Sequence, residues 1–334
     1  MSFFKKIQKN KNLLLLVHNN PDGDALGSSL ALMFYFIKLK YNVNIVSPTK
    51  FSENLSWLPG TEKIIFCNKK NYFLVKKIIF KSDFIFFIDF NNYSRISTAI
   101  KELLYNSVSK KILIDHHPNP TKFDVMIHDS TVPATSILVY RIISDMNNLD
   151  KIDQKISTCL YIGIMMDTGC FRFPSVTSET HLIASKLMKN NLDLHNIYNK
   201  YNDKYNENKL KLLSIALNRL KVIKKYHIAY TSIKSSDIFY PYQQGDSDGI
   251  VGYGLGIKNV ILSVFFFQEK DEYPIKISFR SKGDFDVNKF SKKYFGGGGH
   301  KNASGGILKK SLSETIQYFL TIIQNYYDII KLSI

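Results

Sequence analysis

The sequence predicts an α/β protein in which a doubly wound, mostly parallel sheet is followed by a smaller α/β domain. Two observations carry this prediction. Short apolar runs alternate with segments of helical length through the first 190 residues, as in strands joined by crossover helices. Several of these segments end in Asp or His, as in I-L-I-D-H-H-P at 112–118. Because ligands bind at the carboxyl ends of strands in open α/β sheets, we expect a site at that edge.

Each element of the first domain follows from its apolar pattern. Strands buried on both faces are continuous apolar runs, which predicts strands at 13–17, 43–46, 84–88 and 111–114. Apolar residues at helical spacing predict helices at 25–40, 96–104, 133–146, 153–166 and 177–190. Pro133 suits the first turn of its helix, and Pro21 with Gly23 marks a sharp turn after the first strand. Asp167 then falls at the end of a helix.

A second domain is predicted after a stretch where apolar periodicity weakens and Asn, Lys and Tyr accumulate. We therefore predict a first domain at 1–190, a linker at 191–206 and a second domain at 207–334. Within the second domain we expect helices at 207–223, 287–294 and 312–331 and strands at 227–233, 260–268 and 274–280. The run G-G-G-G-H at 296–300 predicts a loop.

The formal net charge of +17 is the most prominent bulk property. A basic chain favours an anionic partner such as nucleic acid, but Lys and Asn are abundant throughout, so a compositional bias explains the charge equally well. No apolar run reaches the roughly 18–20 residues of a membrane-spanning helix. The 3 cysteines have no paired spacing, which favours a reducing compartment. We expect a cytoplasmic protein without membrane contact.

Side chains that can bind metals occur at the ends of the predicted elements. They are His18, Asp22, Asp24, Asp89, Asp115, His116, His117 and Asp167. Carboxylates and imidazoles without thiolates suit Mn²⁺ or Mg²⁺ better than structural zinc. A single Asp after a strand is more often a helix cap than a ligand, and a single His is more often a core or surface residue. Convergence of the whole set on one sheet edge favours a shared site.

These segments resemble the DHH phosphoesterase family. The resemblance is carried by H-N-N-P-D-G-D-A-L-G-S at 18–28, Asp89, D-H-H at 115–117 and M-D-T-G at 166–169. A later segment, G-G-G-G-H-K-N-A-S-G-G at 296–306, is similar to the signature of the accompanying DHHA1 domain. The short two-domain form resembles the NrnA-type branch, which degrades very short oligoribonucleotides and dephosphorylates 3′-phosphoadenosine 5′-phosphate (pAp).

The resemblance implies two divalent cations, with Mn²⁺ preferred and Mg²⁺ as the alternative. It assigns the first ion to His18, Asp22 and Asp89. It assigns the second ion to Asp24, Asp89, His116 and Asp167, so that Asp89 bridges. The implied catalytic residues are Asp89, Asp115 and His117. His117 would face the phosphate and the leaving group, and Asp115 would be either a ligand or an acceptor that orients a histidine.

For the second domain the resemblance implies a substrate-binding surface. Arg280 would hold a phosphate through two N–H donors, although an ordinary surface arginine on a strand is the alternative. His300 would contact a substrate phosphate, and the glycines before it would allow close approach of the backbone. The complete predicted set is Arg172, Arg280, Ser281, Gly298, Gly299 and His300. The active site would lie in the cleft between the domains, and the resemblance alone suggests a homodimer.

These observations predict a hydrolase that cleaves short oligoribonucleotides to mononucleotides and converts pAp to AMP. One alternative is a phosphodiesterase for cyclic dinucleotides or their linear pApA-type products. A non-catalytic nucleotide-binding module is the alternative from another class, but every motif position is filled. A long-strand exonuclease is disfavoured because no further nucleic-acid-binding domain is recognisable. A pyrophosphatase of this family would have a different second domain, without G-G-G-G-H.

Overall fold

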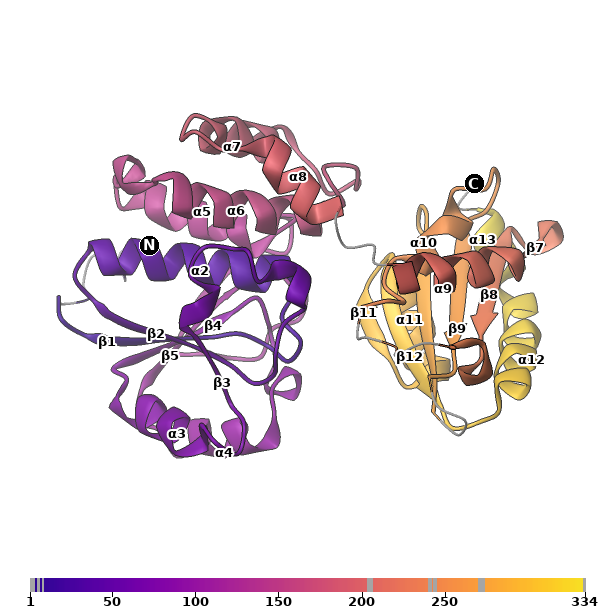
Figure 1. The fold of residues 1–334 in the computed structure, drawn as a ribbon, viewed down its shortest axis with the longest axis horizontal. Coiled ribbons are helices and arrows are strands. Elements are labelled where there is room, and N and C mark those ends of the chain that lie inside the picture. The colour runs from indigo at the N-terminus through magenta and orange to yellow at the C-terminus, as the bar shows by residue number, and fades with distance from the viewer. Residues whose placement is uncertain are drawn as a thin grey trace. The chain divides into compact units, whose positions relative to one another are not determined.

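A computed structural model describes residues 4, 7, 9–202, 207–239, 242, 245–269 and 274–332. The chain divides into two compact units, Met1–Asp203 and Lys204–Ile334 (Figure 1). The predicted cleft between them stays a prediction. Within the described ranges, no helix combines the length and apolarity needed to cross a membrane.

A six-stranded parallel sheet forms the centre of the first unit. Its strands are β1 (Asn12–Leu16), β2 (Asn42–Ser47), β3 (Ile64–Phe66), β4 (Phe84–Ile88), β5 (Lys110–Asp115) and β6 (Val125–His128). They lie in the order β3-β2-β1-β4-β5-β6, so the direction of winding reverses between β1 and β4. Ligands bind at the carboxyl edge beside such a reversal. His18 follows β1 and Asp89 follows β4, which places both residues there.

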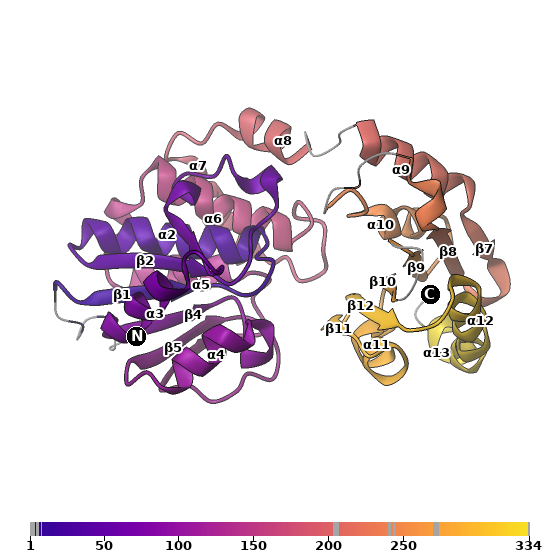
Figure 2. The same cartoon turned by 60° about the horizontal axis from the view of Figure 1, so that its bottom comes forward.

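Helices cover both faces of this sheet (Figures 1 and 2). One face carries α2 (Gly23–Lys38), α5 (Thr135–Asp145) and α6 (Gln154–Asp167), with α7 (Ser178–Met188) and α8 (Leu194–Asn202) beyond them; the other carries α3 (Tyr72–Lys81) and α4 (Thr98–Tyr105). Leu13 and Leu15 of β1 belong to the core under α2, α5 and α6, which we call the first core. Leu14 and Leu16 belong to the core under α3 and α4 on the other face of the sheet. Because successive side chains alternate across a strand, burial on both faces requires the continuous apolar runs seen in the sequence.

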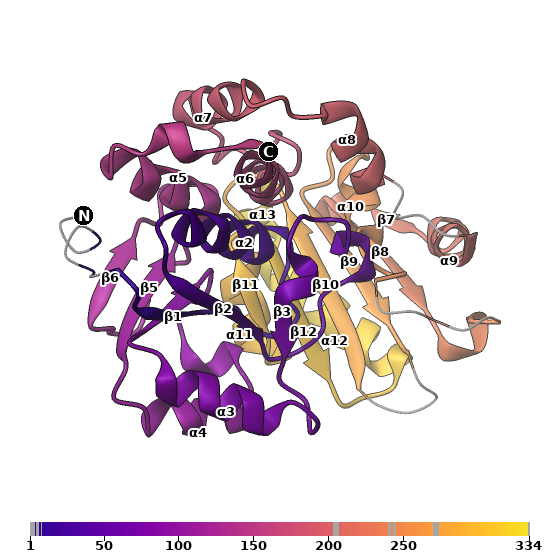
Figure 3. The ribbon, with the colours of Figure 1, turned by 60° about the vertical axis from the view of Figure 1, so that its left-hand side comes forward.

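The second unit contains a mixed six-stranded sheet in the order β11-β12-β10-β9-β8-β7 (Figure 3). The strands are β7 (Lys221–Ile223), β8 (Ile228–Ile233), β9 (Leu262–Phe267), β10 (Ile275–Ser281), β11 (Gly298–His300) and β12 (Ala303–Leu308). Only the β8–β9 pair is parallel among these described strands. Helices α11 (Val287–Phe295), α12 (Leu312–Ile323) and α13 (Tyr327–Lys331) pack on one face, and α9 (Glu207–Asn218) and α10 (Ile250–Leu255) on the other.

The predicted α/β class and the doubly wound sheet are confirmed, but β3, α3, β6, α10 and β12 were not predicted. The predicted helix 207–223 ends at Asn218 because Lys221–Ile223 pairs with β8 as an edge strand. The predicted loop 296–300 is part of the hairpin β11–β12. The predicted linker 191–206 contains helix α8, whose Ile197 is buried in the first core; residues 203–206 lie outside the described residues.

Candidate active site

The carboxyl edge of the first sheet gathers the predicted metal ligands. His18 and Asp89 leave β1 and β4, α2 begins beside Asp22 and Asp24, and α6 ends at Asp167. Donor atoms within 4.8 Å of one another form three overlapping groups. These groups are His18, Asp22 and Asp89; Asp24, His116 and Asp167; and Asp89, His116 and His117. Asp115 belongs to none of these groups.

The carboxylate of Asp89 lies between the groups. Its Oδ2 is 3.7 Å from Nε2 of His18, and its Oδ1 is 3.7 Å from Nε2 of His116. The Thr135 hydroxyl donates to Oδ1 at 2.8 Å. Asp89 also has a φ of 64°, in the left-handed region that a residue other than glycine rarely adopts. The surrounding structure therefore holds this residue in a costly conformation, which is frequent at functional sites.

Asp22 and Asp24 both cap helices. Oδ1 of Asp22 accepts hydrogen bonds from the N–H groups of Asp24 and Ala25 at 3.1 Å, which caps α2. Asp24 accepts from the N–H groups of Thr135 at 2.5 Å and Ser136 at 3.0 Å, which caps α5 from a different helix. The residue before α5 is Ala134, which has no side-chain acceptor to do this itself. A cap and a place in the cluster are therefore compatible.

His18 and His116 both direct Nε2 at carboxylates. Nδ1 of His18 lies 2.7 Å from the carbonyl of Asn19, and Nδ1 of His116 lies 3.1 Å from the carbonyl of Val132. A carbonyl only accepts, so Nδ1 carries the proton in each ring and Nε2 keeps a lone pair in the neutral form. Nε2 of His18 is buried and has no hydrogen-bond partner among the described residues. Metal-binding histidines are oriented in this way.

Crowding of carboxylates shifts the pKa values across the cluster. Burial raises the pKa of Asp24 well above its usual range, and the charges of Asp89 and Asp167 add to the shift. Burial likewise raises the pKa of Asp167 to about 6. For His116, burial opposes protonation, but hydrogen bonding to Asp167 and the nearby carboxylate charges raise its pKa to about 10. Such buried like charges are stabilised by a cation, so oxygen and imidazole donors here fit a divalent metal ion.

His117 is held by hydrogen bonds at its ring and backbone. Its Nδ1 lies 2.7 Å from Oδ1 of the fully buried Asp115, and its peptide N–H donates to Oδ2 at 3.1 Å. Nε2 lies 3.0 Å from Nη1 of Arg95, and the carbonyl lies 2.7 Å from Nε2 of His128. These contacts favour the orienting alternative for Asp115. The sequence did not indicate Arg95, His128 or Thr135 as site residues. Of these, only Thr135 lies in a recognisable pattern, the helix start P-A-T-S at 133–136.

In the second unit, Arg280 and His300 lie in one row across the sheet. Each is the direct cross-strand neighbour of Ala303, Arg280 from β10 and His300 from β11. Directly opposite residues point to the same face, so the two side chains flank a methyl group at a spacing of about 10 Å. Arg280 is half-buried, with Nη1 donating to the Phe279 carbonyl at 2.9 Å, whereas His300 is exposed. This row can present two cationic or polar groups to an anion.

The glycines before His300 are explained first by the hairpin. A Cβ on Gly297 would lie 1.8 Å from the Gly305 carbonyl oxygen, and one on Gly299 would lie 2.4 Å from that of Ala303. The N–H of Gly299 donates to Asn288 at 3.1 Å. Two of the predicted substrate contacts therefore compete with internal bonds, since the Ser281 hydroxyl also donates to Phe285 at 2.7 Å. The half-buried Gly298 pairs with Gly305 in the β11–β12 ladder, and its contact with a substrate stays a prediction.

Arg172 lies in an unusual turn directly after α6. Gly169, Cys170 and Phe171 have φ values of 56°, 58° and 63°, so three consecutive residues adopt the left-handed region. Nε of Arg172 donates to the Gly169 carbonyl at 2.8 Å, and the side chain is exposed. This hydrogen bond therefore holds the Arg172 side chain against the turn that follows Asp167.

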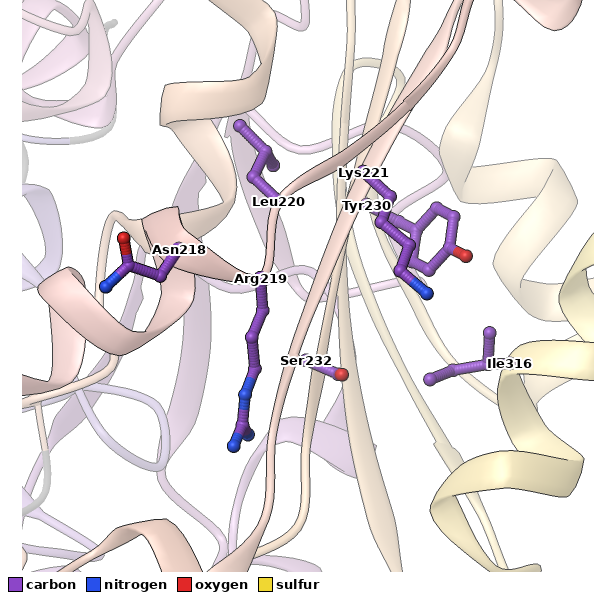
Figure 4. Close-up of a pocket in the computed structure, with 7 residues that line it drawn as sticks. All are labelled: Asn218, Arg219, Leu220, Lys221, Tyr230, Ser232 and Ile316. Carbon is purple, nitrogen blue, oxygen red and sulfur yellow. The ribbon is translucent and has the colours of Figure 1, made fainter.

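A hollow of about 370 Å³ lies at the β7 edge of the second sheet, whereas His300 lies at the β11 edge (Figure 4). It is lined by Asn218, Arg219, Leu220, Lys221, Tyr230, Ser232 and Ile316. Both Nη atoms of Arg219 pair with the carboxylate of Asp237. Because the guanidinium charge is compensated, this hollow is a poorer candidate for phosphate binding than the row of Arg280 and His300.

Comparisons with known proteins identify both units. The sequence profile described as the DHH family, N-terminal domain, matches residues 12–164, and that of the DHHA1 domain matches residues 225–328. The bifunctional oligoribonuclease and PAP phosphatase NrnA of Bacillus subtilis is 26% identical over 88% of this chain and 88% of its own. The Mycoplasma genitalium protein of the same name is 27% identical over 93% of each chain.

A solved structure extends the match to the whole chain. The exopolyphosphatase-related protein from Bacteroides fragilis is 35% identical, with a TM-score of 0.92 over 99% of this chain and 96% of that one. The two profiles occur in the order that the sequence motifs predicted. The chain therefore belongs to the DHH family of phosphoesterases, with a DHH domain followed by a DHHA1 domain.

Proposed function

We propose that this hydrolase cleaves short oligoribonucleotides to mononucleotides and dephosphorylates pAp to AMP, using two divalent cations, preferably Mn²⁺. The observation that carries the proposal is that Asp89 belongs both to the donor group with His18 and to the donor group with His116, and His116 is shared in turn with the group of Asp24 and Asp167. Two groups at one carboxylate suit two ions that share a bridging ligand. The names of the relatives from Bacillus subtilis and Mycoplasma genitalium support the choice of substrates.

In this proposal the first ion is held by His18, Asp22 and Asp89. The second is held by Asp24, Asp89, His116 and Asp167. When bound, two such ions polarise a phosphoryl oxygen and lower the pKa of water. The protein contributes fixed positions for these ligands, since helix caps and buried hydrogen bonds hold the carboxylates before substrate arrives.

The remaining residues act on the substrate. His117, oriented by Asp115, faces the reacting phosphate and the leaving oxygen. Arg280 and His300 bind a second phosphate of the nucleotide, with Arg172 as a further cationic contact and Gly298 as a backbone contact. Ser281 and Gly299, the other predicted contacts, would have to exchange their internal hydrogen bonds to bind the substrate. A substrate with two phosphates, such as pAp or a 5′-phosphorylated dinucleotide, satisfies both sets of residues. The homodimer stays a prediction.

Turnover of several substrates measured side by side with Mn²⁺ tests this proposal. We expect pAp and 5′-phosphorylated dinucleotides to be hydrolysed well, and a 20-mer RNA and cyclic dinucleotides poorly. Faster turnover of a cyclic dinucleotide would instead favour the cyclic phosphodiesterase. Equal rates on the dinucleotide and the 20-mer would favour a long-strand nuclease.

A further inference from the structure

Arg95 joins three loops at the edge where the proposed active site lies. It ends the short 3₁₀ turn Tyr93–Arg95 that follows β4. Its carbonyl accepts a hydrogen bond from the Asn19 N–H, in the loop after β1, at 2.8 Å. Its Nη1 lies 3.4 Å from the Asp89 carbonyl and 3.0 Å from Nε2 of His117, in the loop after β5. Both the backbone and the side chain of Arg95 are therefore used within the site.

The contact with Arg95 requires that Nε2 of the His117 ring accept a hydrogen bond. A guanidinium group has only donors, so Nε2 of His117 must be the acceptor in this bond. The ring proton then lies on Nδ1, where it is donated to Asp115 at 2.7 Å. The ring thus connects a buried carboxylate to a cation. The Asp115 carboxylate by itself keeps a proton on Nδ1, whereas Arg95 holds the Nε2 edge of the ring in one orientation.

The charge of Arg95 is not used elsewhere in the described part of the chain. No carboxylate of the described residues forms an ion pair with it, whereas Arg141 of the same unit pairs with both Asp129 and Glu179. If the only role of Arg95 were to join loops, a carboxylate partner like those of Arg141 would stabilise it further. Its half-buried position and its contact with the imidazole indicate a role in arranging the site.

We propose that Arg95 is a positioning residue for the phosphoester reaction, which holds His117 in one orientation. The inference rests on the proposed function, because it assumes that His117 faces the reacting phosphate. Fixing a catalytic side chain acts on the reacting geometry more than on substrate affinity. The loss on removal should therefore appear in kcat, with the metal ligands left in place.

Kinetics of Arg95→Met and Arg95→Lys, with Arg141→Gln as the matched control, test the proposal. Substrates are pAp and bis-p-nitrophenyl phosphate, and bound Mn²⁺ is counted in each variant. For Arg95→Met we expect kcat to fall about 10²-fold on both substrates while KM changes less than about threefold. Arg95→Lys should keep part of the activity because one donor remains, and Arg141→Gln should keep wild-type kcat. Unchanged kcat, a raised KM alone, or loss of Mn²⁺ in Arg95→Met would overturn the proposal.

The Nε2 resonance of His117 supplies a test that does not depend on activity. In nitrogen-15 NMR of the Mn²⁺-free protein, Arg95→Met should shift this resonance, because the hydrogen bond from the guanidinium group to Nε2 is lost. An identical Nε2 resonance in both proteins would overturn the proposal. If the wild type hydrolyses neither pAp nor oligonucleotides, the proposed substrates are wrong. Arg95 is then still tested by the generic ester and by NMR.

Discussion

Asp89 is the residue on which the proposed two-ion site depends, since its two oxygens face different histidines. We predict that Asp89→Asn lowers kcat at least about 10³-fold, and more than His18→Ala, because one change weakens both donor groups. Asn tolerates the left-handed backbone at this position, so the variant removes charge without adding strain. The measurement is kcat on pAp together with bound Mn²⁺. Near-normal turnover would exclude a bridging role.

His300 should affect binding of the nucleotide and leave the metal ions in place. We predict that His300→Ala raises KM for pAp strongly, with a much smaller effect on bis-p-nitrophenyl phosphate, which has no second phosphate. Some loss of kcat on pAp is also expected, because the grip on a remote phosphate aligns the reacting one. The ratio of the two activities is the quantity to measure. Equal losses accompanied by loss of Mn²⁺ would place His300 in the metal site.

At this scale the sequence identified residues whose position in an element defines their role. His18, Asp22, Asp89 and Asp167 could be predicted because each falls at an element end on one sheet edge. Arg95 could not, since its contacts depend on how three loops meet. The internal hydrogen bonds of Ser281 and Gly299 could not be predicted either, because they depend on how one hairpin packs against its neighbours.

Among the elements, α2 and α6 approach each other closely next to the cluster. A Cβ on Gly163 would lie 2.6 Å from Oδ1 of Asp24 and 2.0 Å from the Ser136 hydroxyl. We predict that Gly163→Ala costs about 1–3 kcal/mol of stability and weakens Mn²⁺ binding, because Asp24 must move. Gly252→Ala is the control, since nothing lies within 4 Å of the added methyl group there. Unchanged Mn²⁺ affinity in Gly163→Ala would show that the site tolerates this displacement.

Arg141 connects α5 to α7 and to the loop after β6. Hydrogen bonds from Thr131 and Arg141 hold the pKa of Asp129 at about 2, and Arg141 also lowers the pKa of Glu179. A lowered pKa stabilises the fold above the unfolded value of about 4, and this contribution is lost as the pH falls towards 2. The urea midpoints of wild type and Arg141→Gln should therefore differ above about pH 4 and converge below it. A gap that persists unchanged to pH 2 would contradict this assignment.

Prediction of the elements succeeded where burial on both faces imposed a continuous apolar run, as in β1 and β4. The edge strand β6 is mostly half-exposed, and β3 has only 3 residues, so neither leaves a clear pattern. The strand β11 begins with glycines, which are depleted in strands and indicate a loop. Its pairing depends on contact with β12, which local sequence does not reveal.

For the whole molecule, activity and stability should both depend on divalent cations. We predict that excess chelator abolishes turnover and lowers the Tm of the first unit, and that Mn²⁺ restores both, because a ligand that binds only the folded state stabilises it. Thermal unfolding and pAp turnover before and after chelation provide the measurement. Full activity in chelator, with no metal retained on the protein, would refute the two-ion site.

The order of two α/β units could be predicted because each carries its own alternation of apolar segments and its own motif. The extent of the first unit could not, because α8 lies in a polar stretch with few apolar residues. Tertiary packing decides such a helix, since Ile197 finds a place in a core formed by distant segments.

The cap that Asp24 provides to α5 has a consequence for how firmly an ion is held. The amide N–H groups of Thr135 and Ser136 bind both oxygens of this carboxylate, but burial and the charges of Asp89 and Asp167 raise its pKa well above the usual range. The same bonds align the carboxylate in advance, which lowers the entropic cost when a cation arrives. A cation that binds there displaces any proton on the carboxylate, so cation binding is coupled to proton release. Occupancy would then depend on the pH as well as on the free cation concentration around the protein.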